Sequence, residues 1–205
     1  GAVIDVSTGA VLWERAPTAA LPIASLTKLM TAMVFLGTNT DWNQEVEMTA
    51  ADNANVEGSF IQLQPGERIK VIDLFYSMLV GSANNAARAL ARSTGLSEAE
   101  FVSRMNAEAE RQGLQKTEFH EVTGLDPENK STPIEYARLA SVAMRYSRIS
   151  DALTRADHIF ETTNTHRTHR VGNTDKLLGD RGVPLIGAKT GYLDEAGDAL
   201  AMRVR

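Results

Sequence analysis

The 205-residue chain has 26 acidic residues against 21 Lys and Arg, for a formal net charge of -5, and 43% of its residues are hydrophobic. These proportions are typical of a globular protein, and the acidic excess argues against a nucleic-acid partner. Cysteine is absent, which excludes disulfides, thiolate metal sites and a cysteine nucleophile. No apolar run approaches the roughly 20 residues of a transmembrane helix, so we expect no membrane-spanning segment in this sequence.

The first part of the chain is predicted to contain a hairpin, a helix and a long loop. Residues 1–15 form two β-prone runs around a Ser-Thr-Gly turn, which is typical of a β-hairpin. From near Ser25 to Val34, apolar residues recur at three- and four-residue spacing, which predicts a helix with a buried stripe. Residues 41–66 are polar with little periodicity, so we expect loops with short elements.

The middle of the chain is predicted to be helical. Amphipathic spacing indicates helices at residues 71–80, 83–93, 97–112 and 133–144. The third begins with a capping-box pattern, Ser97 followed by Glu100, and Gly113 ends it. Thr132 and Pro133 give the fourth helix an N-cap and a first-turn proline.

The last third returns to strand-like sequence. Residues 159–170 are polar and rich in threonine, and we expect loops from there to residue 180. Residues 183–192 predict a strand, and residues 199–205 its hairpin partner. Strands at both ends of a helical middle predict an α+β fold, with one antiparallel sheet from both chain ends packed against a helical lobe.

Three motifs that each occur once carry the candidate chemistry: Ser25-Leu-Thr-Lys28, Ser82-Ala-Asn84 and Lys189-Thr-Gly191. Singly they are weak signals, because a Ser-x-x-Lys arises about once by chance in a chain of this length. Taken alone, Ser25 is equally well a helix N-cap, and Ser82 part of a turn between two helices. The ordinary interpretation of Lys28 is a solvated helix lysine.

Jointly, the motifs are those of an activated serine. Lys28 follows Ser25 by three residues, so both lie on one helix face and the lysine can reach the hydroxyl. A serine hydroxyl is inert until a base takes its proton, and a lysine is a base only when burial or a nearby cation lowers its pKa. The flanking residues are apolar and favour burial, and Lys189 supplies the cation if its strand lies beside the helix.

The order Ser-x-x-Lys, Ser-x-Asn, Lys-Thr-Gly resembles the signature set of penicillin-binding proteins and serine β-lactamases. The stretch Pro22-Ile-Ala-Ser-Leu-Thr-Lys-Leu-Met is similar to the active-site helix of low-molecular-mass D-alanyl-D-alanine carboxypeptidases and endopeptidases. Thr123-Gly-Leu-Asp and Ala196-Gly extend that resemblance along most of the chain. Pro22-Ile-Ala-Ser and Arg170-Val-Gly-Asn-Thr resemble the D,D-endopeptidase branch, of the type called penicillin-binding protein seven.

The resemblance implies a role for each residue that handles the proton or the nucleophile. Ser25 would attack the substrate carbonyl to form an acyl-enzyme, with Lys28 as its general base. Ser82 would relay a proton to the departing amine. Asn84 would hold Lys28 and the substrate amide.

The resemblance also implies a substrate-binding strand. Lys189 and Thr190 would bind the terminal carboxylate of the substrate, and Gly191 would leave room for its backbone as an added β-strand. The N–H groups of Ser25 and Tyr192 would form the oxyanion hole. Asn85, where many relatives have Asp, and Leu193, where Thr is common, depart from the pattern at the rim of the pocket.

The fold that the resemblance implies is that of β-lactamases and D,D-peptidases, with residues 1–205 as a single penicillin-binding catalytic domain. We expect a further strand and a helix to follow Arg205 in this fold. The implied substrates are peptidoglycan stem peptides or their cross-links, with β-lactams as covalent inhibitors and no metal or organic cofactor. The implied location is periplasmic or otherwise outside the cytoplasm, for an exported protein whose signal peptide is not in this sequence.

Three alternatives stay open. A serine β-lactamase would need a carboxylate that activates water, and Glu121 and Glu128 lie in the region where it is expected. Glu121 lacks the Glu-x-x-Leu-Asn pattern and is interpreted as a surface carboxylate. A penicillin sensor would carry the same motifs without turnover. A metal enzyme is suggested by His166 and His169, with His120 and His158 elsewhere in the chain. No HExxH pattern accompanies them, and the 166–169 segment is interpreted as a polar loop.

Overall fold

The computed structural model describes residues 1–38, 41–54, 57–180 and 182–205. A 3-10 turn, η1 (Ala24–Thr27), leads into the first of the described α-helices, which are α1 (Lys28–Leu36), α2 (Val71–Val80), α3 (Asn84–Ser93), α4 (Glu98–Arg111), α5 (Pro133–Ala143) and α6 (Ser147–Thr154). The described strands are β1 (Ala2–Ile4), β2 (Val11–Glu14), β3 (Leu21–Pro22), β4 (Glu45–Glu47), β5 (Arg68–Lys70), β6 (Lys130–Ser131), β7 (Asp157–Glu161), β8 (Thr168–Gly172), β9 (Leu185–Leu193) and β10 (Gly197–Val204). This mixture confirms the predicted α+β class.

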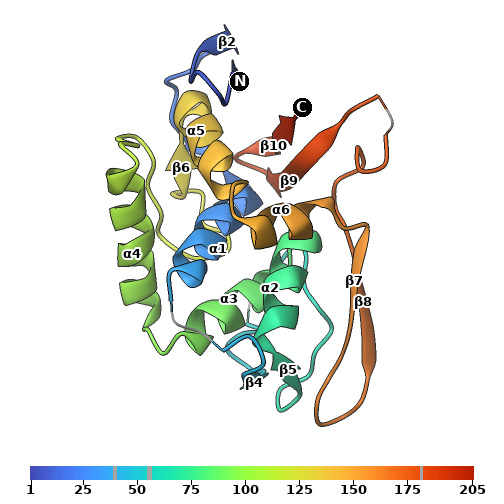
Figure 1. The fold of residues 1–205 in the computed structure, drawn as a ribbon. Coiled ribbons are helices and arrows are strands. Elements are labelled where there is room, and N and C mark those ends of the chain that lie inside the picture. The colour runs from blue at the N-terminus through green and yellow to red at the C-terminus, as the bar shows by residue number, and fades with distance from the viewer. Residues whose placement is uncertain (39–40, 55–56, 181) are drawn as a thin grey trace.

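Helix α1 forms the centre of the molecule, and the other helices surround it (Figure 1). It is buried from Lys28 to Phe35, because its residues are apolar on every side apart from the lysine and one threonine. Helices α2, α3, α4 and α5 all contact it. The Ser-x-x-Lys motif spans η1 and the first residue of α1, so the core holds both ends of it in place.

The four predicted middle helices are confirmed within one residue at each end, and two of them, α4 and α5, begin at a side-chain cap. At the start of α4, Ser97 and Glu100 form a reciprocal capping box. At the start of α5, the Thr132 hydroxyl accepts from the Glu135 N–H. None of the helices in the described part of the chain is long and apolar enough to cross a membrane.

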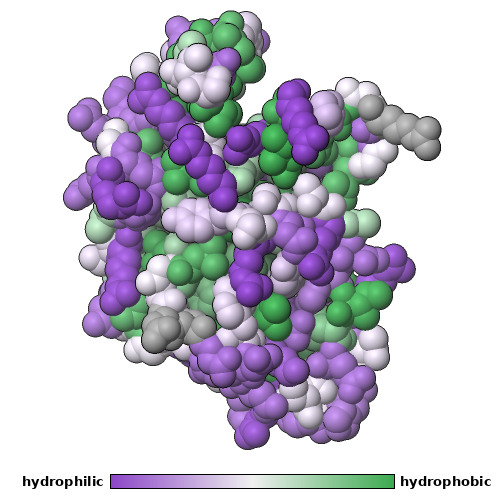
Figure 2. All heavy atoms as spheres, in the orientation of Figure 1, coloured by the Kyte–Doolittle hydropathy of each residue, from purple (hydrophilic) through white to green (hydrophobic). Residues whose placement is uncertain are grey.

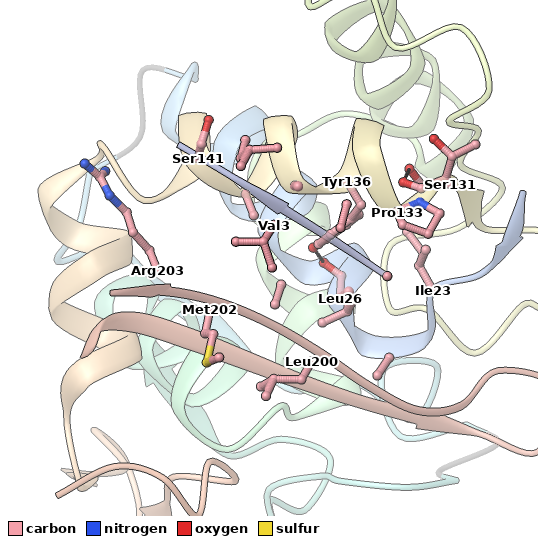
Figure 3. Close-up of a pocket in the computed structure, with 18 of the residues that line it drawn as sticks. Val3, Ile23, Leu26, Ser131, Pro133, Tyr136, Ser141, Leu200, Met202 and Arg203 are labelled. Carbon is pink, nitrogen blue, oxygen red and sulfur yellow. Dashed lines mark hydrogen bonds between the residues drawn. The ribbon is translucent and has the colours of Figure 1, made fainter. Parts of the chain in front are cut away.

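The described strands form five two-stranded antiparallel sheets: β1–β2, β3–β6, β4–β5, β7–β8 and β9–β10. The expected single sheet from both chain ends is not present, since in the described residues β1–β2 and β9–β10 are separate hairpins. Both hairpins pack on α5, and a groove of about 480 Å³ lies between β1 and β10 (Figure 3). Leu200 and Met202 on β10 and Trp13 on β2 are about half exposed. Apolar atoms gather on both hairpins at the top of Figure 2.

The loop predicted for residues 159–170 is instead most of a β-hairpin, β7–β8, and helix α6 just before it was not predicted. Inward-facing rings stabilise the hairpin, because His158, Phe160 and His169 stack in a column that continues onto Tyr76 of α2. This stack is formed between elements distant in sequence, so no local periodicity of apolar residues predicts it. The 41–66 segment has few regular elements, as expected, although its residues 55–56 lie outside the described part.

A loop at residues 121–125 packs against the backbone of η1. Gly124 in this loop has a φ of 90°, and a Cβ built on it would lie 1.9 Å from the carbonyl oxygen of Ala24. On the other side, the Tyr136 hydroxyl of α5 donates to the Leu26 carbonyl at 2.7 Å (Figure 3). The turn that bears Ser25 is thus held by backbone contact and by a buried hydrogen bond.

We predict that Gly124→Ala destabilises the protein by about 3 kcal/mol or more, because the left-handed φ and the contact with Ala24 both oppose a side chain. Gly113→Ala is the matched control, since Gly113 has a φ of 73° but nothing within 4 Å of the added Cβ. It should lose only about 1–2 kcal/mol. Urea unfolding measures both values, and equal losses would contradict the close packing of this loop on η1.

Candidate active site

Ser25 lies in the 3-10 turn η1, one turn before Lys28 opens α1. The N-cap of α1 is Thr27, and the Ser25 hydroxyl caps no backbone group but accepts a hydrogen bond of 2.9 Å from Lys28 Nζ. Ala24, just before it, has a φ of 48°, a left-handed conformation that is uncommon outside glycine. The simple N-cap interpretation of Ser25 is therefore wrong.

Lys28 is fully buried, and its ammonium lies among three oxygen atoms. Besides Ser25 Oγ, Lys28 Nζ donates to Asn84 Oδ1 and to the Thr123 carbonyl, each at 2.6 Å. Burial, and next the positive charge of Lys189, hold the pKa of Lys28 well below that of a free lysine. The predicted arrangement of a buried lysine beside a serine, with a second lysine nearby, is present.

Lys189 and Ser82 form a second lysine–serine pair. Lys189 Nζ donates to Ser82 Oγ and to the Thr190 carbonyl, both at 2.8 Å. Lys189 is buried, which lowers its pKa to about 7. Ser82 lies between α2 and α3 with a φ of 58°, so both serines of the site belong to turns with left-handed backbone.

Two consecutive asparagines at the start of α3 face different parts of the site. Asn84 donates from Nδ2 to the Glu57 carbonyl, which fixes its Oδ1 toward Lys28. Asn85 is fully buried, accepts from the Ile61 N–H and donates to the Ile61 carbonyl. The departure from the family pattern at Asn85 is therefore a structural anchor of the segment beside Asn84, and it does not contact Lys28.

Strand β9 carries the third motif past η1. A Cβ on Gly191 would lie 3.1 Å from the Ser25 backbone nitrogen and 3.2 Å from Ala24 Cβ, so glycine allows the strand to approach the nucleophile. The Thr190 and Thr174 hydroxyl groups are 2.6 Å apart and hydrogen-bonded. Among the described residues β9 pairs with β10 alone, so its other edge carries no partner strand.

The proposed oxyanion donors are the N–H groups of Ser25 and Tyr192. The N–H of a residue at a helix start has no carbonyl one turn earlier to bond, which leaves that of Ser25 available. The Tyr192 side chain is 62% exposed and its hydroxyl donates to Asp194, so only the backbone of this residue belongs to the site.

Four residues outside the three motifs also contribute to the site: Thr123, Thr174, Glu121 and Asn129. Thr123 contacts Lys28 through its backbone carbonyl, and because every residue has one, the sequence does not indicate this contact. Glu121 was interpreted as a loop-surface carboxylate, but it is partly buried and accepts from the N–H groups of Thr123, Gly124 and Leu125.

The two histidines considered as metal ligands belong to the β7–β8 hairpin. His166 is at its tip and pairs with Glu161, whereas His169 is on β8 with its ring stacked on Phe160. Burial lowers the pKa of His169. Among the described residues, no group of three or more His, Asp or Glu side chains could hold a metal ion.

Comparison with known proteins finds sequence relatives among bacterial D-alanyl-D-alanine endopeptidases and carboxypeptidases. A D-alanyl-D-alanine endopeptidase of Haemophilus influenzae is 34% identical over 195 residues, covering 95% of this chain and 66% of that protein. One from Pseudomonas aeruginosa is 33% identical and covers 98% of this chain and 65% of that protein. The D-alanyl-D-alanine carboxypeptidase DacF of Bacillus subtilis is 32% identical, and the match covers 95% of this chain and 50% of that protein.

The fold is shared with solved structures of the same group. The Streptomyces K15 DD-transpeptidase superposes with a TM-score of 0.92 at 28% identity, over 100% of this chain and 83% of that one. A D-alanyl-D-alanine carboxypeptidase from Mycobacterium tuberculosis gives 0.89 at 29% identity, over 100% of this chain and 76% of that one. The predicted family resemblance is confirmed, because the sequence pattern of the D-alanyl-D-alanine carboxypeptidases, peptidase family S11, matches residues 2–205, and this chain belongs to that family.

Proposed function

We propose that this chain is the catalytic domain of a serine D,D-peptidase that cleaves D-alanyl bonds of peptidoglycan stem peptides or cross-links. The chain spans about two thirds of the length of the endopeptidases that it matches and half of the length of the carboxypeptidase. The activity and substrates of the whole protein are therefore part of the proposal. The observation that carries it is the environment of Lys28 Nζ, which has two partners that can only accept and one that can also donate. We infer an exported protein in the periplasm or outside the cell, where peptidoglycan lies.

The partners of Lys28 decide which way its lone pair points. A neutral lysine amine has two N–H bonds and one lone pair. Asn84 Oδ1 and the Thr123 carbonyl can only accept, so they take the two N–H bonds. Ser25 Oγ is the partner that can donate, and the lone pair is therefore directed at its proton. The lowered pKa of Lys28 makes this neutral form accessible.

Acylation then follows from the positions of these groups. Lys28 takes the hydroxyl proton while Ser25 Oγ forms a bond to the D-alanyl carbonyl carbon, and the carbonyl oxygen becomes negative. The N–H groups of Ser25 and Tyr192 stabilise that oxyanion. The C–N bond breaks as the amine takes, through Ser82, the proton that Lys28 removed from Ser25, and water later hydrolyses the ester.

Substrate would lie along the unpaired edge of β9 as an added antiparallel strand. Protonated Lys189 and the Thr190 hydroxyl would bind the carboxylate of the terminal D-residue, and the Thr174 hydroxyl holds that of Thr190 in place. A β-lactam carries a similar carboxylate beside its reactive carbonyl, so it would acylate Ser25. The donor set needs no metal or organic cofactor for these steps.

Slow release of a β-lactam is favoured over β-lactamase activity. Rapid deacylation would need a carboxylate free to activate water. The Glu121 carboxylate is occupied, because it accepts from three backbone N–H groups, the Thr123 hydroxyl and the Asn129 amide. A penicillin sensor would share this geometry, and turnover of peptide substrate separates the two functions.

We predict that Ser25→Ala lowers peptide cleavage by more than about 1,000-fold and abolishes covalent labelling by a fluorescent penicillin, because the nucleophile is removed. Purified monomeric and cross-linked muropeptides are the substrates. Release of terminal D-alanine indicates a carboxypeptidase, and monomer from dimer an endopeptidase. Ser103→Ala, on an exposed position of α4, should match the parent. Equal activity of the parent and Ser25→Ala would overturn the mechanism, and labelling without any turnover would indicate a sensor.

We predict a bell-shaped pH dependence of acylation by penicillin. The rate rises as Lys28 loses its proton, and it falls above about 7 as Lys189 loses the charge that binds the carboxylate. Lys189→Arg keeps a cation at alkaline pH, so the alkaline limb of the pH profile should move to higher pH, although the maximum rate falls. Lys116→Arg, at an exposed position, is the control. An alkaline limb unmoved in Lys189→Arg would assign that limb to another group.

A further inference from the structure

The carboxylate of Glu121 is the centre of the loop that supplies the Thr123 carbonyl to Lys28. Its Oε2 accepts from the N–H and the hydroxyl of Thr123, each at 2.6 Å. Its Oε1 accepts from the Gly124 N–H, from the Leu125 N–H at 3.1 Å and from Asn129 Nδ2 at 2.9 Å. These five hydrogen bonds to one carboxylate hold residues 121–125 and Asn129 together.

One peptide group connects Glu121 to Lys28. The Thr123 carbonyl and the Gly124 N–H belong to the same planar trans peptide, so they point in opposite directions. The N–H donates to Glu121 Oε1, and the carbonyl accepts from Lys28 Nζ at 2.6 Å. Any rotation of this peptide that frees the carboxylate also withdraws the carbonyl from the lysine.

Asn129 extends the same support to the residue before Lys28. This side chain is fully buried, and its amide donates to Thr27 Oγ1 at 3.1 Å as well as to Glu121. Its Oδ1 accepts from the N–H groups of His120 and Glu121. The carboxylate therefore acts on Lys28 from two sides, through the Thr123 carbonyl and through η1.

Resting on the proposed function, we propose that Glu121 is a positioning residue for the general base. It fixes the Thr123–Gly124 peptide so that the carbonyl takes one N–H of Lys28 and leaves the lone pair of the amine directed at Ser25. Its negative charge also opposes burial and the charges of Lys189 on β9 and Arg88 on α3, all of which lower the pKa of Lys28. Glu121 thus sets both the direction and the basicity of the lysine.

The test is Glu121→Gln, which keeps the size of the side chain, removes its charge and places an amide among the backbone donors. We expect the rate of Ser25 acylation by a fluorescent penicillin at neutral pH to fall by about 10- to 100-fold. We also expect the acid limb of its pH profile to move to lower pH, because the pKa of Lys28 falls when the charge of Glu121 is lost. A purely structural role would lower the rate without moving the limb.

Two further variants complete the experiment. Glu118→Gln removes one charge from the same segment at an exposed side chain, so its profile should match that of the parent. Glu121→Asp keeps the charge on a shorter side chain, so its acid limb should stay where the parent has it while its rate falls. Thermal unfolding checks the fold of each variant. If Glu121→Gln does not fold, a displaced acid limb in Glu121→Asp alone overturns the inference, because the charge is retained there.

The outcomes separate this inference from the proposed function. Labelling of Ser25 in the parent together with an unmoved acid limb in folded Glu121→Gln would overturn the inference and leave the peptidase proposal standing. An acid limb displaced in Glu121→Asp as far as in Glu121→Gln would also overturn it, because charge would not be the cause. A parent that is not labelled at Ser25 would overturn both.

Discussion

The burial of the Lys28 amine is the constraint on which the rest of the site depends. A lysine without solvent is stable only if its hydrogen bonds are satisfied or if a lowered pKa lets it lose its proton. Ser25, Asn84 and Thr123 supply the acceptors, and the neighbouring Lys189 adds a charge that favours the neutral form of Lys28. The core around α1 provides the burial, so the packing that stabilises the fold also lowers the pKa of Lys28.

Backbone strain and close approach recur where the reactive groups lie. Ala24 and Ser82, one beside and one within the two lysine–serine pairs, have positive φ without being glycine. Such residues cost of order 1–3 kcal/mol each and persist only where the surroundings determine them. Gly124 and Gly191 allow a loop and a strand to contact the turn at Ser25, where a Cβ would intrude. The site is assembled from backbone contacts as much as from side chains.

A second layer of buried polar groups holds the first. Asn85 anchors the segment beside Asn84, the Thr174 hydroxyl bonds that of Thr190, and Asn129 joins Glu121 to η1. A buried polar group is costly unless it is satisfied, so these networks admit one arrangement of the loops that they join. Segments of low regularity can therefore carry precise chemistry.

The sequence by itself determined helices α1 to α5, the terminal hairpins and the motifs of the site. Local physics sufficed there, because apolar spacing marks a buried helix face and the Ser97 and Thr132 caps mark where a helix begins. The three-residue step from Ser25 to Lys28 is a helical distance, so the pairing could also be read directly. The family pattern then supplied the roles.

Only the tertiary structure decided how distant segments meet. The β7–β8 hairpin depends on a ring stack with Tyr76 of α2, and the terminal hairpins are held apart on α5 although each was predicted correctly. The Thr123 carbonyl is invisible in the sequence because every residue has one. Glu121 looked like a surface carboxylate for the same reason: its partners are mostly backbone N–H groups, and their convergence on it is a property of the folded loop.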